Sequence, residues 1–167
     1  MSWQSYIDTQ LVNKLNSQNQ WEITGCVEHA AIFGAADLSI WASTPGFALG
    51  QYNINVPTDD GVNEESCHVN EVDIFRSVVT TRSAGSKAGI RICNEKYFLV
   101  NYDEERHTIY LKKNGGGACI VKTLQTYIFA SWNGALEHGG VHPGNQNPGL
   151  CNERCESLAA YLAGEGF

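Results

Sequence analysis

The sequence predicts a single α+β domain, residues 1–167, in which a helix at each end of the chain flanks an antiparallel β-sheet. Apolar residues recur at helical spacing over Ser2 to Leu15 and again over Asn152 to Ala163. From Gly89 onward, short β-branched and aromatic runs alternate with turn-forming residues. Helices and strands segregated along the chain in this way are typical of α+β domains.

The first predicted helix is amphipathic. Ser2 is a suitable N-cap, because its hydroxyl can accept a hydrogen bond from the first helical turn. Two adjoining faces carry the other relevant side chains: Trp3, Tyr6, Ile7 and Gln10 on one, and Ile7, Leu11 and Leu15 on the other. The polar stretch from Asn16 to Gln20 has no periodicity, so we expect a loop there.

A β-hairpin is predicted next. His29 to Gly34 and Leu38 to Ala42 are short apolar runs, and Ala35, Ala36 and Asp37 separate them.

The segment 56–73 is strongly acidic, with six acidic side chains and no lysine or arginine. Because like charges repel and none of these groups has an obvious partner, we expect a solvated loop. At its end, Asn70 can cap a helix of about ten residues. The apolar side chains of that helix, at helical spacing, are Val72, Phe75, Val78 and Val79.

Five strands then follow at spacings that fit an antiparallel meander. They are Ile90–Cys93, Lys96–Val100, Thr108–Leu111, Ala118–Val121 and Thr126–Phe129. Asn114–Gly117 lies between two of these strands rather than before a helix, so it predicts a hairpin turn and not a phosphate-binding loop. The stretch from Trp132 to Gly149, rich in Gly, Asn, Pro and His, predicts a long loop.

The final helix places its apolar side chains at i, i+3, i+4 and i+7. These side chains are Cys155, Leu158, Ala159 and Leu162.

Composition excludes several classes of protein. The chain is 43% hydrophobic and 17% charged, which rules out a largely disordered protein. Eleven basic and 18 acidic residues give a net charge of −7, which argues against nucleic acid as a partner. We expect no membrane-spanning segment and no secretory signal. The six cysteines are too dilute for a disulfide scaffold, so we expect free thiols in a reducing, cytoplasmic compartment.

Charge is nevertheless polarised along the chain. Segment 85–125 contains seven basic and four acidic residues, which gives it a net charge of +3. Such a segment suits an acidic partner, although a solvated surface is the plainer interpretation.

No common catalytic motif is present: the chain lacks GxGxxG, GxxxxGK[ST], HExxH and GxSxG. Cys151, Cys155, His138 and His142 have residue types that bind zinc, but their spacing is loose. A buried Cys155, with Cys151 at the margin of the loop, is the favoured interpretation. We therefore expect no catalytic residue, no metal and no cofactor.

Aromatic side chains gather near both ends of the chain. Trp3 and Tyr6 share a face of the first helix, and Tyr161, Leu162 and Phe167 lie in or after the last one. If the two helices lie side by side, these residues form an aromatic strip that suits a polyproline II ligand. The alternative is a small core between the helices.

Several sequence motifs resemble the profilin family, in order along nearly the whole chain. They are MSWQSYID at the start, AAIFGAAD followed by SIWA, GGGACIVKT, HGG, and SLAAYLAGEGF at the end. The first and last are the most specific, and HGG is similar to animal-type profilins. The resemblance implies a central antiparallel sheet with the terminal helices on one face and smaller helices on the other. It also implies a monomeric cytoplasmic protein, associated with the cytoskeleton, that binds monomeric actin, promotes its nucleotide exchange and regulates filament assembly.

The resemblance also implies two binding surfaces. Proline-rich proteins such as formins would contact Trp3, Tyr6, Trp41, Tyr161, Leu162 and Phe167. Phe167 replaces the tyrosine of many family members, which keeps the ring and loses one hydroxyl. Actin would contact Lys96, Phe98, Leu99, Val100, Lys112, Lys113, Lys122, His138, Gly140, Asn152 and Arg154.

The sequence departs from the family pattern at several places. Asn101 stands where an arginine is common, and Glu153 where a lysine often stands. Residues 141–149 are inserted beside the expected actin surface, and the loop within 52–69 is longer than usual, with an acidic stretch at 56–67. With a net charge of −7, we expect phosphoinositide binding to be weak.

Two alternatives remain open from the sequence. One is a profilin-like adaptor for proline-rich partners with weak or no actin binding. The other is a zinc-dependent enzyme that uses Cys151, Cys155, His138 and His142.

Overall fold

The computed structural model describes residues 2–15, 18, 21–23, 25–138 and 144–167. Within these residues, a seven-stranded sheet forms the centre of the molecule, and every neighbouring pair of strands is antiparallel. In spatial order the strands are β4 (Ile40–Ser43), β3 (His29–Gly34), β11 (Thr126–Asn133), β10 (Gly116–Lys122), β9 (Thr108–Lys113), β8 (Glu95–Asp103) and β7 (Ile90–Ile92). The predicted meander is confirmed in strands β7 to β11.

The predicted hairpin of β3 and β4 is also confirmed, but β4 begins at Ile40 rather than at Leu38. Leu38 has a φ of 58° and its backbone N–H donates to the Gly34 carbonyl at 2.9 Å. This positive φ places Leu38 in the turn, because extended strand geometry requires a negative φ.

The N-terminal helix is shorter than predicted. Ser2 caps it as expected, since its Oγ accepts a hydrogen bond from the Ser5 N–H at 3.2 Å. Helix α1 (Trp3–Tyr6) continues as the π-helical turn η1 (Ile7–Val12) and ends there.

Residues Asn13–Leu15, predicted as helix, instead form strand β1, which pairs with β2 (Trp21–Ile23). Pairing with β2 satisfies the backbone N–H and C=O groups of this segment. The apolar periodicity of a single segment gives no information about such a strand partner. The predicted loop from 16 to 20 lies, apart from Gln18, outside the described residues.

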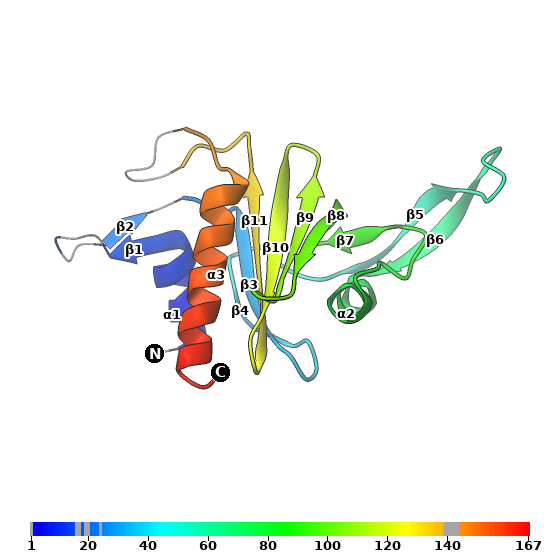
Figure 1. Ribbon diagram of the computed structural model, residues 1–167. Helices are drawn as coiled ribbons and strands as arrows, with labels where there is room; N and C mark the ends of the chain where they lie inside the picture. The colour runs from blue at the N-terminus through cyan, green and yellow to red at the C-terminus, as the bar shows by residue number, and fades with distance from the viewer. Residues whose placement is uncertain (1, 16–17, 19–20, 24, 139–143) are drawn as a thin grey trace.

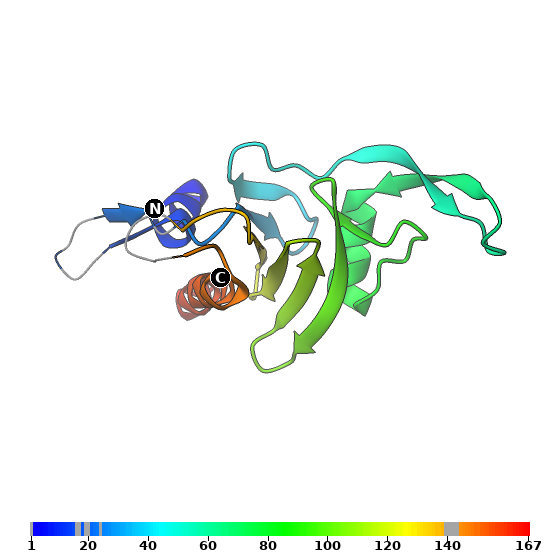
Figure 2. The same ribbon diagram turned by 90° about the horizontal axis from the view of Figure 1, so that it is seen from above.

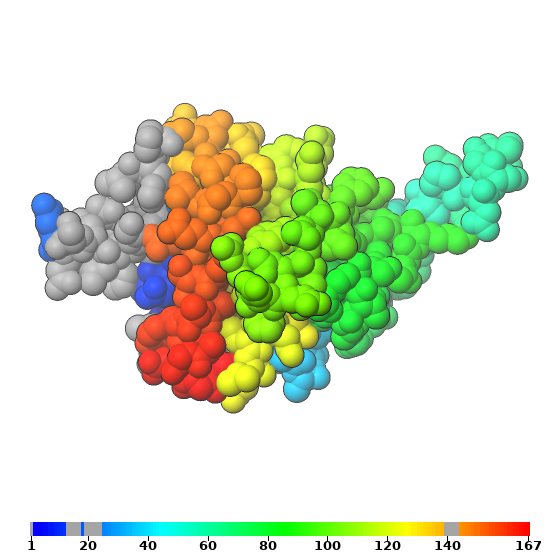
Figure 3. Space-filling model, in the orientation of Figure 1, coloured from blue at the N-terminus to red at the C-terminus, as the bar shows by residue number. Residues whose placement is uncertain are grey.

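The acidic segment contains strands, so the prediction of a solvated loop over 56–73 is wrong for most of its length. Strand β5 (Gln51–Pro57) and β6 (Glu64–Asn70) pair along seven positions, from Gln51 with Asn70 to Pro57 with Glu64. We call this hairpin, residues 51–70, the arm, and it projects away from the body (Figures 1 and 3). The alternating apolar side chains Tyr52, Ile54 and Val56 explain the strand, because they line one face of it.

Helix α2 (Glu71–Thr81) follows the arm and confirms the predicted helix. Asn70 caps it, with Oδ1 accepting hydrogen bonds from the N–H groups of Val72 and Asp73. Its first residue, Glu71, is only 1% exposed, contrary to the expectation that this acidic segment is solvated. Three donors compensate its burial: the Gly50 N–H at 2.9 Å, the Tyr52 hydroxyl at 2.7 Å and the Asn94 N–H at 2.8 Å.

Helix α3 (Pro148–Gly164) begins four residues earlier than predicted. Asn147 caps it through a hydrogen bond from the Leu150 N–H at 3.1 Å. Pro148 occupies the first turn, where a backbone N–H would have no partner within the helix, so the N–H that proline lacks is not missed. The preceding segment is irregular in its described part, apart from an isolated bridge between Glu137 and Asn145. No helix in the described part of the chain is both long and apolar enough to cross a membrane.

The sheet separates two hydrophobic cores. On one side lies α2, and on the other lie α1, η1 and α3, as Figure 2 shows. In β10, Ala118 and Ile120 belong to the first core, and Cys119 and Val121 to the second. This alternation follows from the two-residue period of a strand. The predicted arrangement, with both terminal helices on one face, is therefore confirmed.

Candidate functional site

An aromatic cluster joins the two ends of the chain, with Trp3 at its centre. Its ring centroid lies 5.7 Å from that of Tyr6, 4.8 Å from that of Trp41 and 5.2 Å from that of Phe167. Tyr6 in turn lies 6.0 Å from Tyr161 on α3. The structure therefore brings together all five aromatic members of the predicted proline-binding set, and we call these five rings the aromatic cluster.

The sixth predicted residue, Leu162, lies beneath this cluster. It is fully buried in the core between α3 and the sheet, so it supports the rings and presents no surface. Trp41 and Tyr161, by contrast, are 38% and 49% exposed. Burial raises the pKa of Tyr6, and the neighbouring Tyr161 and Glu165 raise it further. The Tyr6 hydroxyl therefore stays protonated at neutral pH and can donate a hydrogen bond.

Two residues that the sequence reasoning did not identify hold Trp3 and Trp41 together. The Gln4 side chain pairs with the backbone of Ser43 in β4, donating to its carbonyl at 2.9 Å and accepting from its N–H at 3.3 Å. Gly34 lies under the indole of Trp41, where an added Cβ would approach the ring to 2.8 Å. The glycine is therefore required for the ring to lie against the β3 backbone.

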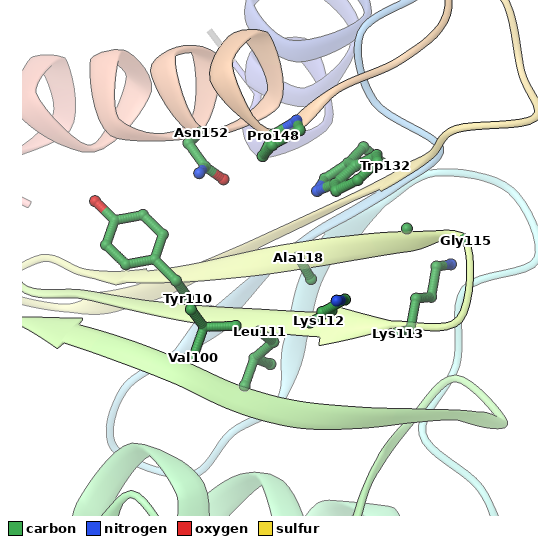
Figure 4. Close-up of a pocket in the computed structure, with 11 residues that line it drawn as sticks. Val100, Tyr110, Leu111, Lys112, Lys113, Gly115, Ala118, Trp132, Pro148 and Asn152 are labelled. Atoms are coloured by element: carbon green, nitrogen blue, oxygen red, sulfur yellow. The ribbon is translucent and has the colours of Figure 1, made fainter.

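A second surface lies over strands β8 to β10, beside the start of α3. A cavity of about 540 Å³ opens there, and Figure 4 shows side chains of both the sheet and α3 pointing toward it. Val100, Tyr110 and Lys112 line it from the strands, Trp132 from β11, and Asn152 from α3. Asn152 Oδ1 is buried and has no hydrogen-bond partner among the described residues. Because an unpaired buried acceptor is unfavourable, this oxygen is positioned to accept a donor from a ligand.

Next to this cavity, the exposed apolar side chains of Phe98 and Val100 lie two residues apart on one face of β8, and we call them the ridge. Leu99 stands between them and pairs with Leu111, whose side chain belongs to the core on the other face. Val100 is 64% exposed, Phe98 60% and Leu99 41%. Lys96 Nζ lies 5.3 Å from the Phe98 ring centroid, so a positive charge flanks the ridge. Five predicted actin-contact residues thus lie together: Lys96, Phe98, Val100, Lys112 and Asn152.

The other predicted actin contacts are not part of this exposed group, although Lys113 lines the cavity. Lys113 is only 4% exposed, and its Nζ lies 2.7 Å from Glu28 Oε1 and 3.7 Å from Glu95 Oε1. Lys122 stands five residues beyond Gly117, the partner of Lys112, which is about 17 Å along β10.

The remaining three members differ in what the structure describes. His138 contacts Asn147 before α3, with 3.2 Å between its Nε2 and Asn147 Nδ2, and Arg154 is half-buried on α3. Gly140 lies outside the described residues.

Acidic neighbours reduce the positive character that segment 85–125 has in the sequence. Lys87 pairs with Asp59 and Glu65 of the arm at 3.2 and 2.9 Å. Arg106 Nη1 lies 3.6 Å from a Glu156 oxygen on α3. These pairs, together with that of Lys113, leave Lys96 and Lys112 as the cations beside the exposed ridge.

Three buried thiols lie between the sheet and α3. The hydrogen bond to Cys151 alone would lower the pKa of Cys119, but a hydrogen bond with Cys155 and burial outweigh it and raise this pKa. A hydrogen bond with Cys119, together with burial, raises the pKa of Cys151. Protonated thiols are poor nucleophiles and poor metal ligands. In the described ranges, no three His, Cys, Asp or Glu side chains are arranged to hold a metal ion, and His142 lies outside them.

Comparisons with known proteins agree with this architecture. The model of the Profilin family matches residues 1–167. A profilin of Tetrahymena pyriformis is 35% identical over 144 residues, which are 84% of this chain and 90% of that protein. Profilin-3 of Dictyostelium discoideum is 30% identical over 167 residues, with both chains covered in full.

Solved structures agree as well. The crystal structure of Acanthamoeba castellanii profilin II is 26% identical, with a TM-score of 0.64 over 99% of this chain and 100% of that chain. Mouse profilin IIa, solved in complex with a double repeat from the FH1 domain of mDia1, shares the fold at 21% identity and a TM-score of 0.56, with both chains covered in full.

Proposed function

The chain belongs to the profilin family, and from this we propose that it binds monomeric actin and regulates filament assembly while binding proline-rich ligands such as formins. The observation that carries the proposal is the aromatic cluster, in which Trp3 contacts Tyr6, Trp41 and Phe167. The complex of mouse profilin IIa with the FH1 repeat of mDia1 supports the proposal that this chain binds proline-rich partners.

The chemistry of the aromatic cluster fits a polyproline II ligand. Such a ligand is already extended and has no internal hydrogen bonds, so little conformational entropy opposes its binding. Flat rings fit between the prolines, and an indole N–H or a tyrosine hydroxyl can donate to the free proline carbonyls. The half-exposed Trp41 and Tyr161 rings would supply the outer contacts.

For actin, we propose the ridge of β8 and the neighbouring cavity as the contact surface. The apolar side chains of Phe98 and Val100 would be buried by the partner, and Asn152 would accept a hydrogen bond from it. Lys96 and Lys112 would face acidic groups of actin. The protein supplies no catalytic group: we propose that it speeds nucleotide exchange by binding a more open state of actin more tightly.

A second candidate function is that of an adaptor for proline-rich partners with weak or no actin binding. The ion pairs of Lys87, Arg106 and Lys113 favour it, because acidic side chains of the protein itself then compensate three of its positive charges, which reduces the attraction for an acidic partner. Under either candidate we propose a cytoplasmic, monomeric protein, associated with the cytoskeleton, that binds phosphoinositides weakly.

A fluorescence titration tests the proline-rich ligand. Adding decaproline peptide to the wild-type protein should change the intrinsic tryptophan fluorescence in a saturable way, and Trp3→Ala should abolish the change. Trp132→Phe is the matched control, because Trp132 lines the other surface and should leave the titration intact. No saturable change in the wild type would overturn this part of the proposal.

An assembly assay with pyrene-labelled actin separates the two candidates. The actin-binding function predicts that the wild type slows spontaneous polymerisation and that Phe98→Ala together with Val100→Ala weakens this effect. Both side chains are exposed, so the fold should be preserved, and decaproline binding should be unchanged. Unaltered polymerisation with wild-type protein that still binds decaproline would establish the adaptor.

A further inference from the structure

A groove of about 510 Å³ lies at the Trp41 end of the aromatic cluster. The turn between β3 and β4 forms one side of it, and the turn between β10 and β11 forms the other. Figure 1 shows both turns at the end of the molecule where the C-terminus lies. The residues that line the groove are Gly34, Ala35, Ala36, Asp37, Trp41, Leu124 and Gln125.

Backbone hydrogen bonds tie this groove to the aromatic cluster. The Ala35 N–H donates to the Gln125 carbonyl at 2.8 Å, and the Gln125 N–H donates to the Phe167 carbonyl at 2.6 Å. The Thr123 hydroxyl also donates to the Phe167 carbonyl, at 2.8 Å. Trp41 belongs to both the groove and the aromatic cluster, and Gln125 of the groove is hydrogen-bonded to Phe167 of the cluster. A ligand that lies along the rings can therefore continue into the groove.

The groove has an apolar wall and a single charged group. Trp41 and Leu124 form the wall, and Leu124 is 73% exposed, so its side chain is accessible to a ligand. Asp37 is the only ionisable side chain among the lining residues that the structure describes, and none of them is basic. Its Oδ1 accepts hydrogen bonds from the Ser39 N–H at 3.0 Å and from the Ser39 hydroxyl at 2.8 Å.

These hydrogen bonds from the Ser39 N–H and hydroxyl lower the pKa of Asp37, so the group is a carboxylate at neutral pH. They also fix its position while leaving Oδ2 available. An anchored anion beside an exposed indole suits a cation, because the carboxylate attracts it and the ring face can stack with it.

We propose that this groove holds the residues that flank the proline segment of the same ligand, and that Asp37 selects a lysine or arginine among them. The inference rests on the proposed binding of proline-rich ligands and adds a specificity determinant to it. An apolar flanking residue would pack on Leu124, and the cation would reach Asp37 beyond it. Proline-rich segments that have neither an apolar nor a basic flank would bind through the aromatic cluster alone.

Five peptides test the inference by tryptophan fluorescence or calorimetry at low salt. One is decaproline, two carry Leu-Lys at its N-terminal or C-terminal end, and two carry Leu-Gln at the same ends. One of the lysine peptides should bind the wild type about two- to fivefold more tightly than its glutamine counterpart, the range for an exposed ion pair. High salt should remove this preference, since it screens exposed charges.

Two variants locate the effect. Asp37→Asn should abolish the preference for lysine and leave decaproline affinity unchanged, since an amide oxygen can keep both hydrogen bonds from Ser39. Leu124→Ser should weaken the peptides that carry leucine and leave decaproline unaffected.

A lysine preference that persists in Asp37→Asn, or equal binding of the lysine and glutamine peptides by the wild type, would overturn the groove inference alone. If decaproline itself does not bind the wild type, the proposed function fails, and the inference that rests on it fails with it.

Discussion

Lys113 and Glu28, 85 residues apart in the sequence, form an ion pair of 2.7 Å inside the protein. The lysine side chain is almost completely buried and lies 5.7 Å from the ring centroid of Tyr97. The pair connects the end of β9 to the segment that precedes β3, on the far side of β10 and β11. It therefore holds together four strands at one end of the sheet.

The Glu28–Lys113 pair should make stability depend on pH. Burial alone would raise the pKa of Glu28, but hydrogen bonds from Lys113 and Asn133 and the charge of Lys113 outweigh it and lower this pKa below its ordinary value of 4.5. A lowered folded-state pKa means that the stabilisation is complete above the ordinary value. It is lost as the pH falls from there through the folded-state pKa.

We expect Glu28→Gln to lower the free energy of unfolding by about 3 kcal/mol at pH 7, since it leaves Lys113 without its main partner. The difference from wild type should shrink as the pH falls below 4.5. Urea denaturation at several pH values measures both. Asp73→Asn is the control, because its pair with Arg76 is exposed and should contribute about 0.5 kcal/mol or less. A deficit that stays constant from pH 7 to pH 3 would contradict the explanation.

Glu71 should anchor the base of the arm. Replacing it with alanine leaves the Gly50 N–H, the Tyr52 hydroxyl and the Asn94 N–H without their acceptor, and we expect a loss of about 3 kcal/mol. Glu71→Gln retains acceptor capacity and should lose less. Hydrogen exchange at Gly50 and Asn94 reports the effect locally, and unchanged protection in the alanine variant would show that Glu71 is not the anchor.

Gly34 should be necessary for proline-rich ligands although it need not touch them. In Gly34→Ala, the new Cβ would lie 2.8 Å from the Trp41 ring, so the indole must shift, which disturbs its contact with Trp3. Losing an aromatic pair of about 1 kcal/mol corresponds to about a fivefold weaker affinity for decaproline. Gly50→Ala is the matched control, because its Cβ would meet nothing closer than 3.9 Å. Equal affinities of the two variants would disprove the positioning role.

The thiols should differ in reactivity. Cys119, Cys151 and Cys155 are buried, and the raised pKa of the first two keeps them protonated, so iodoacetamide should modify them only after unfolding. Cys67 and Cys93 are partly exposed and should react first in the native protein. Peptide mass spectrometry after timed labelling distinguishes these groups. Rapid modification of Cys151 at native pH would show that the start of α3 opens more easily than its packing indicates.

Periodicity alone predicted most of the sheet, α2 and α3, because each of these elements buries one face. The arm was not predicted, because the acidic charge of segment 56–73 was given more weight than the alternation of Tyr52, Ile54 and Val56. Lys113 was likewise predicted to lie at the surface, because only its neighbours in the sequence were considered. Its partner Glu28 is distant in the sequence, and only the finished sheet brings them together. The roles of Gln4 and Gly34 were not predicted for a related reason. Each contacts a residue of β4, and only the folded chain brings β4 next to it.

The contact between Trp3 and Phe167 has a practical consequence for anyone handling this protein. Both ends of the chain meet at the aromatic cluster, so a purification tag or fluorescent reporter fused directly to either end would compete with ligands for the same space. The tip of the arm, at residues 58–63, is exposed and far from the aromatic cluster (Figure 1). An internal label inserted there would leave both ends of the chain untouched.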